Sequence, residues 1–406
     1  MTWTTHYPEH APKPHFHQGN NSLGITFDSE KAVGHLEKVF SVIPGKSYRI
    51  ACDAIVPECS CNNATIIVTW STTDSDATMV QRDYVFFKDL TPTQRHFEQV
   101  FQAPEKCTHA IIWCMHKWQR GTATFNNLEI AETNPVSPKI ARLAAVNLYY
   151  PPANSTFESN RADMEAGIKN LCQNVPSLDF ILLPETHPSR GVPGTSFQRS
   201  EPIQDGPTFN LCKHYAVKYS TNICASVIER EQDNTLHCTA FVVNRTGNLA
   251  GIFRKVHLTV GEQTSGIIPG KEFNIIKLDF ANVGISICWD NWFLESARMQ
   301  RLNGADFLAF PLAGDAKESH WSKTWSARCI DNSLPMVVSV ADPKVPSAII
   351  DRDGVWLDQT TQKHGFAFAE LDLNERKRSW WLSVGPAFGD PYQLYLAERR
   401  QIAYKF

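Results

Sequence analysis

Short hydrophobic segments separated by turns occupy the chain from about residue 22 to residue 132. Proline and glycine mark the turns, as in the dipeptide Pro44-Gly45. In one segment Ile66, Val68 and Trp70 recur with a period of two residues, which predicts a strand with one apolar face. Eight short strands at this spacing predict a β-sandwich of the jelly-roll kind. The expected strands are Gly24–Phe27, His35–Val42, Ser47–Ile55, Thr65–Trp70, Tyr84–Phe87, His96–Gln102, Ala110–Met115 and Thr122–Ile130.

From residue 139 onward, helical and strand periodicities alternate. Met164, Ile168 and Leu171 share one face of a helix expected over Asn160–Gln173, and a second helix is expected over Pro207–Lys218. The segments around these helices are mostly apolar and predict buried strands. They include Leu143–Tyr149, Asp179–Pro184, Asn222–Ile228, His237–Asn244, Leu249–Lys255, Phe307–Phe310 and Met336–Val340. This alternation predicts an α/β domain built in layers.

These patterns divide the chain into five parts. Residues 1–20, rich in histidine and proline, are expected to form a flexible arm, and residues 21–132 the sandwich domain. The segment T-N-P-V-S-P at residues 133–138 is expected to be a linker, because it holds two prolines and no apolar periodicity. Residues 139–374 form the predicted α/β domain. Residues 375–406 are too rich in aromatic side chains for a solvated tail, so we expect them to contact another subunit of a homo-oligomer.

The composition narrows the classes of partner. A net charge of −3 over 406 residues provides no electrostatic attraction for nucleic acid or for an anionic membrane. No apolar run approaches the roughly 18 residues of a membrane span, and the first residues do not resemble a secretory signal. The eleven cysteines are odd in number and scattered, as free thiols in a reducing compartment would be. We therefore expect a cytoplasmic protein.

Two groups of residues could ligate metal, and neither is supported by its surroundings. They are His6, His10, His15 and His17 in the arm, and Cys59 and Cys61 in the sandwich. The histidines lack an evident scaffold, and the cysteines lack a second pair at zinc-finger spacing. We expect no metal and no cofactor.

Three predicted strand ends carry polar residues that do not suit a core. A strand over Val283–Ile287 ends on Cys288, just before a helix expected over Phe293–Leu302, where aligned backbone N–H groups favour a thiolate. Glu185 follows the strand L-L-P, and Lys255 lies in G-I-F-R-K-V-H-L. Taken singly, these residues are commonly a filler thiol, a salt-bridge partner and an exposed cation. Together on one sheet edge they form the nucleophile, base and cation that thiol-based acyl transfer requires.

Around these residues the chain resembles the nitrilase superfamily of carbon–nitrogen hydrolases. The matching motifs are L-L-P-E-T at Glu185, G-x-x-R-K-x-H-L at Lys255 and C-x-D-x-x-F-x-E from Cys288. A-R-C-I-D-N-S-L-P-M-V-V-S-V and S-A-I-I-D-R-D-G follow in the order of the family. The resemblance covers residues 139–374 and implies an α-β-β-α sandwich with a Glu–Lys–Cys triad.

The resemblance also implies roles for the site residues. Glu185 would take the thiol proton while Cys288 attacks, and Lys255 with the backbone N–H of Trp289 would stabilise the oxyanion. In amidase-type members a second glutamate positions the substrate, and Glu262 is the best candidate for it here. Glu295 is expected only to brace or cap the helix after the nucleophile.

The substrate class stays open between related reactions. Trp289 and Asn291 agree with the Cys-Trp-Glu-Asn motif of true nitrilases, whereas Asp290, Phe293 and Glu295 follow the spacing of amidases and carbamoylases. We favour hydrolysis of a small-molecule amide over hydrolysis of a nitrile or an N-carbamoyl group.

The N-terminal sandwich suggests a function of a different class. F-x-V-I-P-G-K-S-Y-R-I and G-T-A-T-F-N-N-L-E-I resemble galactose-binding-like carbohydrate-binding modules. Trp70, Trp113 and Trp118 are candidates for a sugar-stacking platform, although core and edge packing is the commoner role. A carbohydrate-binding scaffold with an inactive hydrolase domain is therefore the alternative, and the intact triad argues against it.

Overall fold

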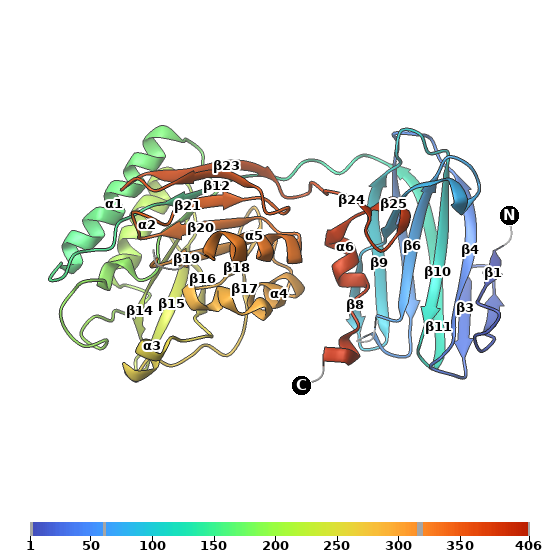
Figure 1. Cartoon of the computed structure of the whole chain (residues 1–406), viewed down its shortest axis with the longest axis horizontal. Coiled ribbons are helices and arrows are strands. Elements are labelled where there is room, and N and C mark those ends of the chain that lie inside the picture. The colour runs from blue at the N-terminus through green and yellow to red at the C-terminus, as the bar shows by residue number, and fades with distance from the viewer. Residues whose placement is uncertain (1–2, 60–61, 315–319, 405–406) are drawn as a thin grey trace. The chain divides into compact units, whose positions relative to one another are not determined.

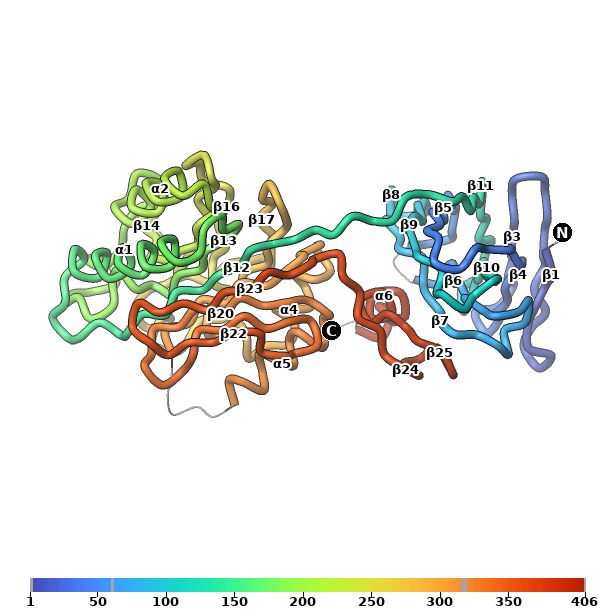
Figure 2. Tube along the Cα trace, turned by 90° about the horizontal axis from the view of Figure 1, so that it is seen from above, coloured from blue at the N-terminus to red at the C-terminus, as the bar shows by residue number. Residues whose placement is uncertain are grey.

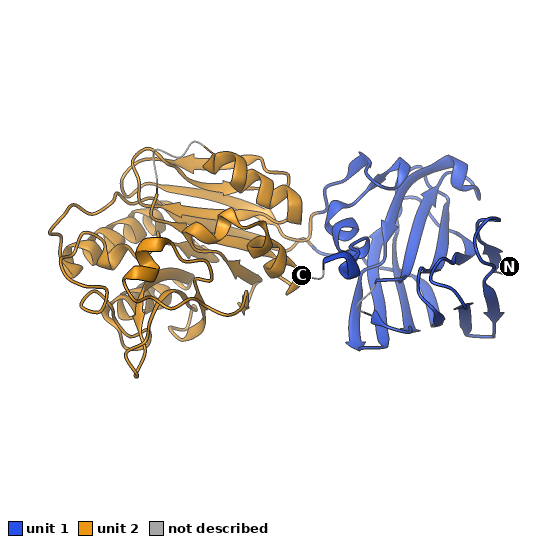
Figure 3. Ribbon diagram, turned by 60° about the horizontal axis from the view of Figure 1, so that its bottom comes forward, with its two compact units in different colours: residues 1–137, 376–406 blue, residues 138–375 orange. Residues whose placement is uncertain are grey.

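The computed structural model describes residues 3–59, 62–314 and 320–404. The chain divides into two compact units, of which unit 1 holds residues 1–137 and 376–406 and unit 2 holds residues 138–375 (Figure 3). Among the described residues no helix is long and apolar enough to cross a membrane.

Unit 1 consists of two largely antiparallel sheets around one hydrophobic core. One sheet has the order β1-β4-β10-β6-β7-β25-β24 and the other β2-β3-β11-β5-β9-β8 (Figure 1). Ile25, Ile50 and Val68 come from different strands of the two sheets and meet in this core. The strands are β1 (Thr4–His6), β2 (His15–Gln18), β3 (Ser22–Phe27), β4 (Val33–Ser41), β5 (Ser47–Ile55), β6 (Ala64–Ser71), β7 (Met79–Tyr84), β8 (Phe87–Thr91), β9 (Gln94–Gln102), β10 (His109–Lys117), β11 (Gly121–Thr133), β24 (Ser379–Trp381) and β25 (Gly385–Gly389), with the short helix η2 (Asp76–Thr78).

The predicted N-terminal arm is instead part of these sheets. β1 pairs with β4, so that His6 lies opposite His35, and β2 pairs with β3, so that Phe16 lies opposite Ile25. An edge strand exposes unpaired N–H and C=O groups, and the N-terminal segment satisfies them on both sheets. The prediction of a mobile arm over residues 1–20 is therefore wrong for the described part of that segment. Cys61, one of the two cysteines considered for metal, lies outside the described residues.

The C-terminal segment also differs from the expectation of a separate tail. It forms β24, β25 and the helix α6 (Pro391–Ala397), and it ends in η5 (Gln401–Tyr404). Val384, Ala387 and Leu394 are buried in a cluster with Ile67 and Tyr84 of the sandwich. Much of the aromatic and apolar content of the tail is thus explained by packing within unit 1. Its role as an oligomer contact stays a prediction.

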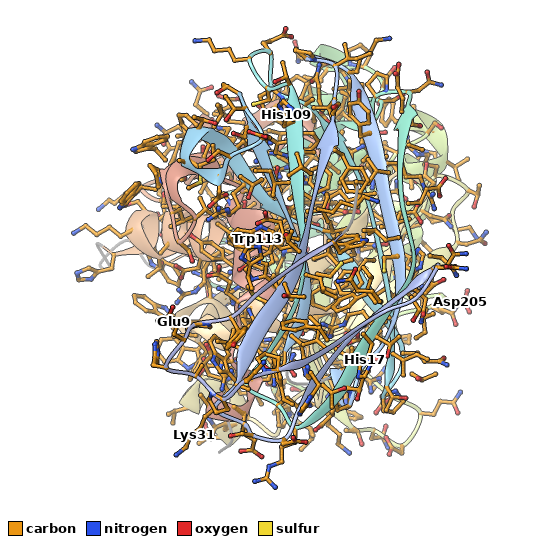
Figure 4. The ribbon with its side chains drawn as sticks, turned by 90° about the vertical axis from the view of Figure 1, so that its right-hand side faces the viewer. Glu9, His17, Lys31, His109, Trp113 and Asp205 are labelled. Carbon is orange, nitrogen blue, oxygen red and sulfur yellow. The ribbon has the colours of Figure 1, made fainter. Side chains whose placement is uncertain are left out.

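The three tryptophans considered for sugar stacking do not share one surface. Trp70 is fully buried, and its Nε1 donates a hydrogen bond to Asp83 at 2.9 Å. The ring of Trp113 stacks against His35 with 4.5 Å between ring centroids, and Trp118 is 43% exposed. Trp113, on β10, is labelled in Figure 4. Core packing therefore accounts for Trp70, as is common for a large aromatic side chain.

Unit 2 contains two six-stranded mixed sheets that pack face to face. Their orders are β16-β15-β14-β13-β12-β23 and β17-β18-β19-β20-β21-β22. Phe180 and Phe307, one from each sheet, meet edge to face with 5.2 Å between ring centroids. The strands are β12 (Ile140–Val146), β13 (Phe180–Leu182), β14 (Asn222–Arg230), β15 (Leu236–Val243), β16 (Leu249–Arg254), β17 (Ile275–Lys277), β18 (Asn282–Ile285), β19 (Phe307–Leu312), β20 (Met336–Val340), β21 (Ser347–Ile350), β22 (Trp356–Thr360) and β23 (Phe366–Asp372).

Helices cover the outer faces of the two sheets. Met164 of α1 and Phe209 of α2 are buried against the first sheet, and α4 and α5 contact strands of the second (Figure 1). The helices are α1 (Phe157–Asn174), α2 (Pro207–Tyr219), α3 (Val260–Thr264), α4 (Leu294–Leu302) and α5 (Trp321–Asn332), with η3 (His187–Ser189) and η4 (Cys288–Trp292). The layers follow the order α-β-β-α that the family resemblance implies.

Burial on both faces explains why the strands of unit 2 are continuously apolar. On β12, Leu143 and Ala145 face the core between the sheets, while Ala144 and Val146 face α1 and α2. β23 lies beside β12 in antiparallel register, as the trace in Figure 2 shows. Strands sandwiched in this way read as hydrophobic runs rather than as an alternating pattern. Ser226 and Thr239 are polar residues in the middle of these strands, but they are small and buried, whereas the charged side chains of the site stand beyond strand ends.

Candidate active site

The three polar strand ends singled out in the sequence meet in one cavity. Glu185 follows β13, Lys255 follows β16, and Cys288 lies just beyond β18. The cavity has a volume of about 560 Å³, and all three side chains line it. Lys255 Nζ lies 2.9 Å from Glu185 Oε1. The packing of the two sheets thus brings together residues that are far apart in the chain.

Glu185 is a buried carboxylate held by three donors. Lys255 Nζ donates to Oε1, while an Nη of Arg190 and the backbone N–H of Ala313 donate to Oε2 at 2.9 Å and 3.1 Å. Burial alone would raise the pKa of Glu185, but the charges of Lys255 and Arg190 outweigh it and hold the pKa below its ordinary value of 4.5. The carboxylate is therefore ionised at neutral pH.

Lys255 is buried between two carboxylates, with only 1% of its side chain exposed. Its Nζ donates to Glu262 Oε1 at 2.8 Å as well as to Glu185. Burial favours the neutral amine, yet the neighbouring negative charges, Glu185 first, raise the pKa of Lys255 well above 10.5. The site therefore contains a permanent ammonium group. The sequence alone allowed Lys255 to be an exposed cation at a strand end, and the structure shows that it is buried.

Glu262 reaches the ammonium from the short helix α3. Its Oε2 accepts hydrogen bonds from the backbone N–H of Thr259 at 2.8 Å and from Thr259 Oγ1 at 3.0 Å. This capping box fixes the carboxylate while Oε1 contacts Lys255. Glu295, by contrast, is exposed in the first turn of α4, and the N-cap of that helix, Phe293, forms no side-chain cap. The prediction that Glu295 caps the helix is therefore wrong, and its role as a brace stays a prediction.

Cys288 occupies a strained position at the start of η4. Its backbone φ is 45°, in the left-handed region that non-glycine residues rarely adopt. The fully buried Asp290 holds this turn, because it accepts hydrogen bonds from the backbone N–H groups of Ile287 at 3.1 Å and His257 at 2.8 Å. The strain and its support present the sulfur to the cavity, at a tight 3₁₀ turn rather than at the N-terminus of an α-helix.

The resting form of Cys288 differs from the expectation of a stabilised thiolate. Burial and the negative charge of Glu185 raise the pKa of the thiol far above 9.0, although Lys255 and Arg190 act in the opposite direction. The sulfur therefore stays protonated until a base removes its proton. The ionised Glu185, which binds the ammonium group of Lys255, is the base that lines the same cavity.

Arg190, Arg199 and Tyr150 also line the cavity and were not identified from the sequence. Arg190 lies five residues after Glu185, and its guanidinium stands 5.6 Å from the ring centroid of Tyr150. All three lie outside the helices and strands, where no periodicity points to a buried position. The cluster T-H-P-S-R after Glu185 was the one available signal, since charged residues beside a predicted base are candidates for the same site.

Two groups of described side chains bring three potential metal ligands within 4.8 Å of one another. They are Glu185, Cys238 and Glu262 in unit 2, and His6, His35 and Glu37 in unit 1. In the first group, the Lys255 ammonium already lies between the two carboxylates. In the second, Trp113 Nε1 donates to Glu37 at 2.8 Å. In the first group, the ammonium therefore already supplies a positive charge between the two carboxylates.

Comparison with known proteins identifies the α/β domain. The family model described as carbon-nitrogen hydrolase matches residues 142–379. A probable nitrilase of Schizosaccharomyces pombe is 32% identical over 203 residues, which cover 49% of this chain and 74% of that protein. A citrullinase of Francisella tularensis is 29% identical over 216 residues, 49% of this chain and 73% of that protein.

A solved structure shows the same fold. Nit3 of Saccharomyces cerevisiae, a member of branch 10 of the nitrilase superfamily, has a TM-score of 0.52 and 19% identity over 59% of this chain and 92% of that one. The nitrilase-type sandwich predicted for this region is thereby confirmed. The sandwich over residues 21–132 lies outside the matched region, and its likeness to galactose-binding modules stays a prediction. The chain belongs to the carbon–nitrogen hydrolase family.

Proposed function

We propose that the protein hydrolyses the C–N bond of a small-molecule amide through a thioester on Cys288. The observation that carries this proposal is the contact between Lys255 and the buried, ionised Glu185 on the wall of the cavity that Cys288 also lines. A base, a cation and a thiol around one cavity are the groups that acyl transfer needs. Membership of the carbon–nitrogen hydrolase family supports hydrolysis of a C–N bond, and we propose in addition that this bond belongs to an amide.

The first half of the reaction forms the thioester. Glu185 accepts the thiol proton as the sulfur of Cys288 bonds to the carbonyl carbon, and the carbonyl electrons move onto its oxygen. Lys255 Nζ and the backbone N–H of Trp289 stabilise this oxyanion. The tetrahedral intermediate then collapses, the C–N bond breaks, and the nitrogen leaves with the proton that Glu185 returns.

The second half releases the acid. Glu185 takes a proton from water as the water oxygen bonds to the thioester carbon, and the same oxyanion site accommodates the new negative charge. The C–S bond breaks, and the proton returns to the sulfur of Cys288. The strong hydrogen-bonding frame of Glu185, with donors to both oxygens, keeps the carboxylate in place through both halves.

The aspartate at position 290 favours an amide over a nitrile. Asp290 occupies the position that is glutamate in the nitrilase motif, and its carboxylate binds His257, whose ring stacks on Phe293 with 3.7 Å between centroids. An aspartate at this position, with Phe293 and Glu295 at the amidase spacing, supports the amidase and carbamoylase branches. Relatives include the citrullinase and an N-carbamoylputrescine amidase of Arabidopsis thaliana, 30% identical over 35% of this chain and 52% of that protein. Hydrolysis of an N-carbamoyl group is therefore the second candidate.

Ammonia release from a panel of substrates tests the proposal. The panel holds matched amides, nitriles and N-carbamoyl compounds, and Cys288→Ala is the control. We expect ammonia from amides, none with the variant, and an acyl group on Cys288 in mass spectra after rapid acid quench. Release from nitriles alone would replace the amide by a nitrile. Equal release by the two proteins on every substrate would refute the thioester mechanism.

A further inference from the structure

One arginine in the catalytic cavity has no protein partner among the described residues. Arg199 lines the cavity, and its Nε is buried without a hydrogen-bond acceptor. A second donor on the cavity wall, Trp321 Nε1, is likewise buried and unsatisfied. Buried donors without acceptors are costly and rare in native proteins. Both donors therefore call for an acceptor that the described part of the chain does not supply.

The other charged side chains of the described cavity wall neutralise one another. Lys255 and Arg190 bind Glu185, and Lys255 also binds Glu262. Three cations thus face two carboxylates, and Arg199 is the cation left over. A cavity with one uncompensated positive charge and free donors attracts an anion and disfavours a cationic substrate.

The backbone fixes Arg199 in relation to the catalytic strands. Its N–H donates to the carbonyl of Thr195 at 3.1 Å. Two residues further on, the N–H of Glu201 donates to Ile228 at 3.0 Å, and the carbonyl of Glu201 accepts from Arg230 at 2.9 Å. The loop is therefore pinned to β14 immediately after Arg199. The guanidinium is placed by this pinned backbone rather than by an ion pair.

We propose that Arg199 binds a carboxylate of the substrate, so that the substrate is a small monoamide of a dicarboxylic acid. A guanidinium presents a planar fork of N–H donors that matches a carboxylate. The inference rests on the proposed amide hydrolysis, in which the monoamide and water give a dicarboxylate and ammonium. A cavity of about 560 Å³ suits a molecule of this size. Arg199 would thus select the substrate while Cys288 reacts at its other end.

The kinetic test compares substrates that differ only in the terminal group. Succinic acid monoamide has a carboxylate where butyramide has a methyl group. 4-Aminobutyramide has a carbon that bears an ammonium group at the same place. Glutaric acid monoamide and valeramide form a second, longer pair. We expect kcat/KM to favour the carboxylates by roughly 10- to 100-fold, the range of one hydrogen bond to a charged group. Arg199→Met should remove this preference mainly by raising KM for the carboxylate substrates, and it should keep the wild-type Tm. Arg199→Lys should recover part of it.

A matched control comes from the neighbouring strand. Arg230 packs on Phe197 with 5.0 Å to the ring centroid and does not belong to the cavity wall, so Arg230→Met should retain the preference. Equal kcat/KM for the carboxylate and methyl members of both pairs, or an Arg199→Met variant with the wild-type preference, would overturn the inference while leaving amide hydrolysis intact.

A binding measurement separates this inference from the proposed reaction. Calorimetry with Cys288→Ala, which cannot turn over, should detect both acid monoamides, and adding Arg199→Met should weaken their binding by roughly 10- to 100-fold. Such Arg199-dependent binding, together with a wild-type protein that releases no ammonia from any amide, would refute the reaction and keep the subsite. Hydrolysis of neutral amides without this binding would refute the subsite alone. The absence of both would refute both.

Discussion

Replacing Lys255 by methionine removes the ammonium group from the centre of the site and keeps a side chain of similar length. In the wild type, Nζ lies 2.9 Å from Glu185 and 2.8 Å from Glu262, and the three side chains are 1%, 1% and 18% exposed. The variant therefore leaves two largely buried carboxylates without the cation between them. Both the stability and the activity of the protein should respond.

The loss of stability follows from the broken buried pair. Removing one partner of such a pair typically costs about 3 to 5 kcal/mol. Because Arg190 still bonds to Glu185 and Thr259 still bonds to Glu262, we expect a loss of about 3 kcal/mol at neutral pH. A strand-end position outside the core would have predicted no loss, and the burial of Lys255 changes that expectation.

The pH dependence provides a signature of this mechanism. In the wild type the pKa of Glu185 is held below 4.5, so its stabilising contribution is complete above that pH and is lost as the pH falls through the lowered pKa. In Lys255→Met, burial should raise the pKa of Glu185, so that the penalty is present at pH 7 and diminishes toward pH 4. The difference in unfolding free energy between the two proteins should therefore shrink as the solution becomes acidic.

The activity should fall further than the stability. A donor to the oxyanion is worth about 100- to 1000-fold in turnover, so ammonia release by Lys255→Met should decline by at least that factor. Lys255→Arg should fail similarly, because a planar guanidinium does not fit between the two carboxylates as a compact ammonium does. Arg254, the next cation, bonds to Glu229 at 2.9 Å and to Glu231 at 2.6 Å and is engaged elsewhere.

Chemical denaturation between pH 4 and pH 8 and ammonia release on the same samples provide both measurements. Activity above about a tenth of wild type in a folded Lys255→Arg variant would show that Lys255 does not contact the reacting atoms. A stability difference that is independent of pH would refute the assignment of the penalty to buried carboxylates.

Three further outcomes are expected. Glu262→Gln should lower kcat by about 10- to 100-fold, since it weakens the charge that holds Lys255, whereas the exposed Glu295→Gln should leave ammonia release unchanged; a similar loss in both would contradict the role of Glu262. Limited iodoacetamide treatment followed by peptide mapping should label Cys288 first, because Glu185-assisted deprotonation compensates for its raised pKa; slow labelling of an accessible Cys288 would refute this. The protein should be at least a dimer by light scattering at micromolar concentration, because Trp380 and Trp381 are 56% and 58% exposed, and a monomer would contradict the prediction.

Local sequence patterns determined the helices and strands, and they also indicated Glu185, Lys255 and Cys288 as site residues. The apolar run before Glu185, the motif around Lys255 and the strand before Cys288 each lie within a few consecutive residues. Strand and helix periodicities likewise operate over short windows, which is why the layered α/β domain was predictable. The residues immediately before such a position therefore indicate that it stands at the end of a buried strand.

The tertiary structure decided what depends on distances between segments remote in the chain. The pinned loop places Arg199 on the cavity wall, and Asp290 braces the nucleophile turn through His257, 33 residues away. The C-terminal segment packs on strands that precede it by about 300 residues, and the N-terminal segment completes both sheet edges. The protonation of Cys288 follows from burial and from the balance of Glu185 against the surrounding cations. Such through-space energies depend on which side chains become neighbours after folding, and no short stretch of sequence contains that information.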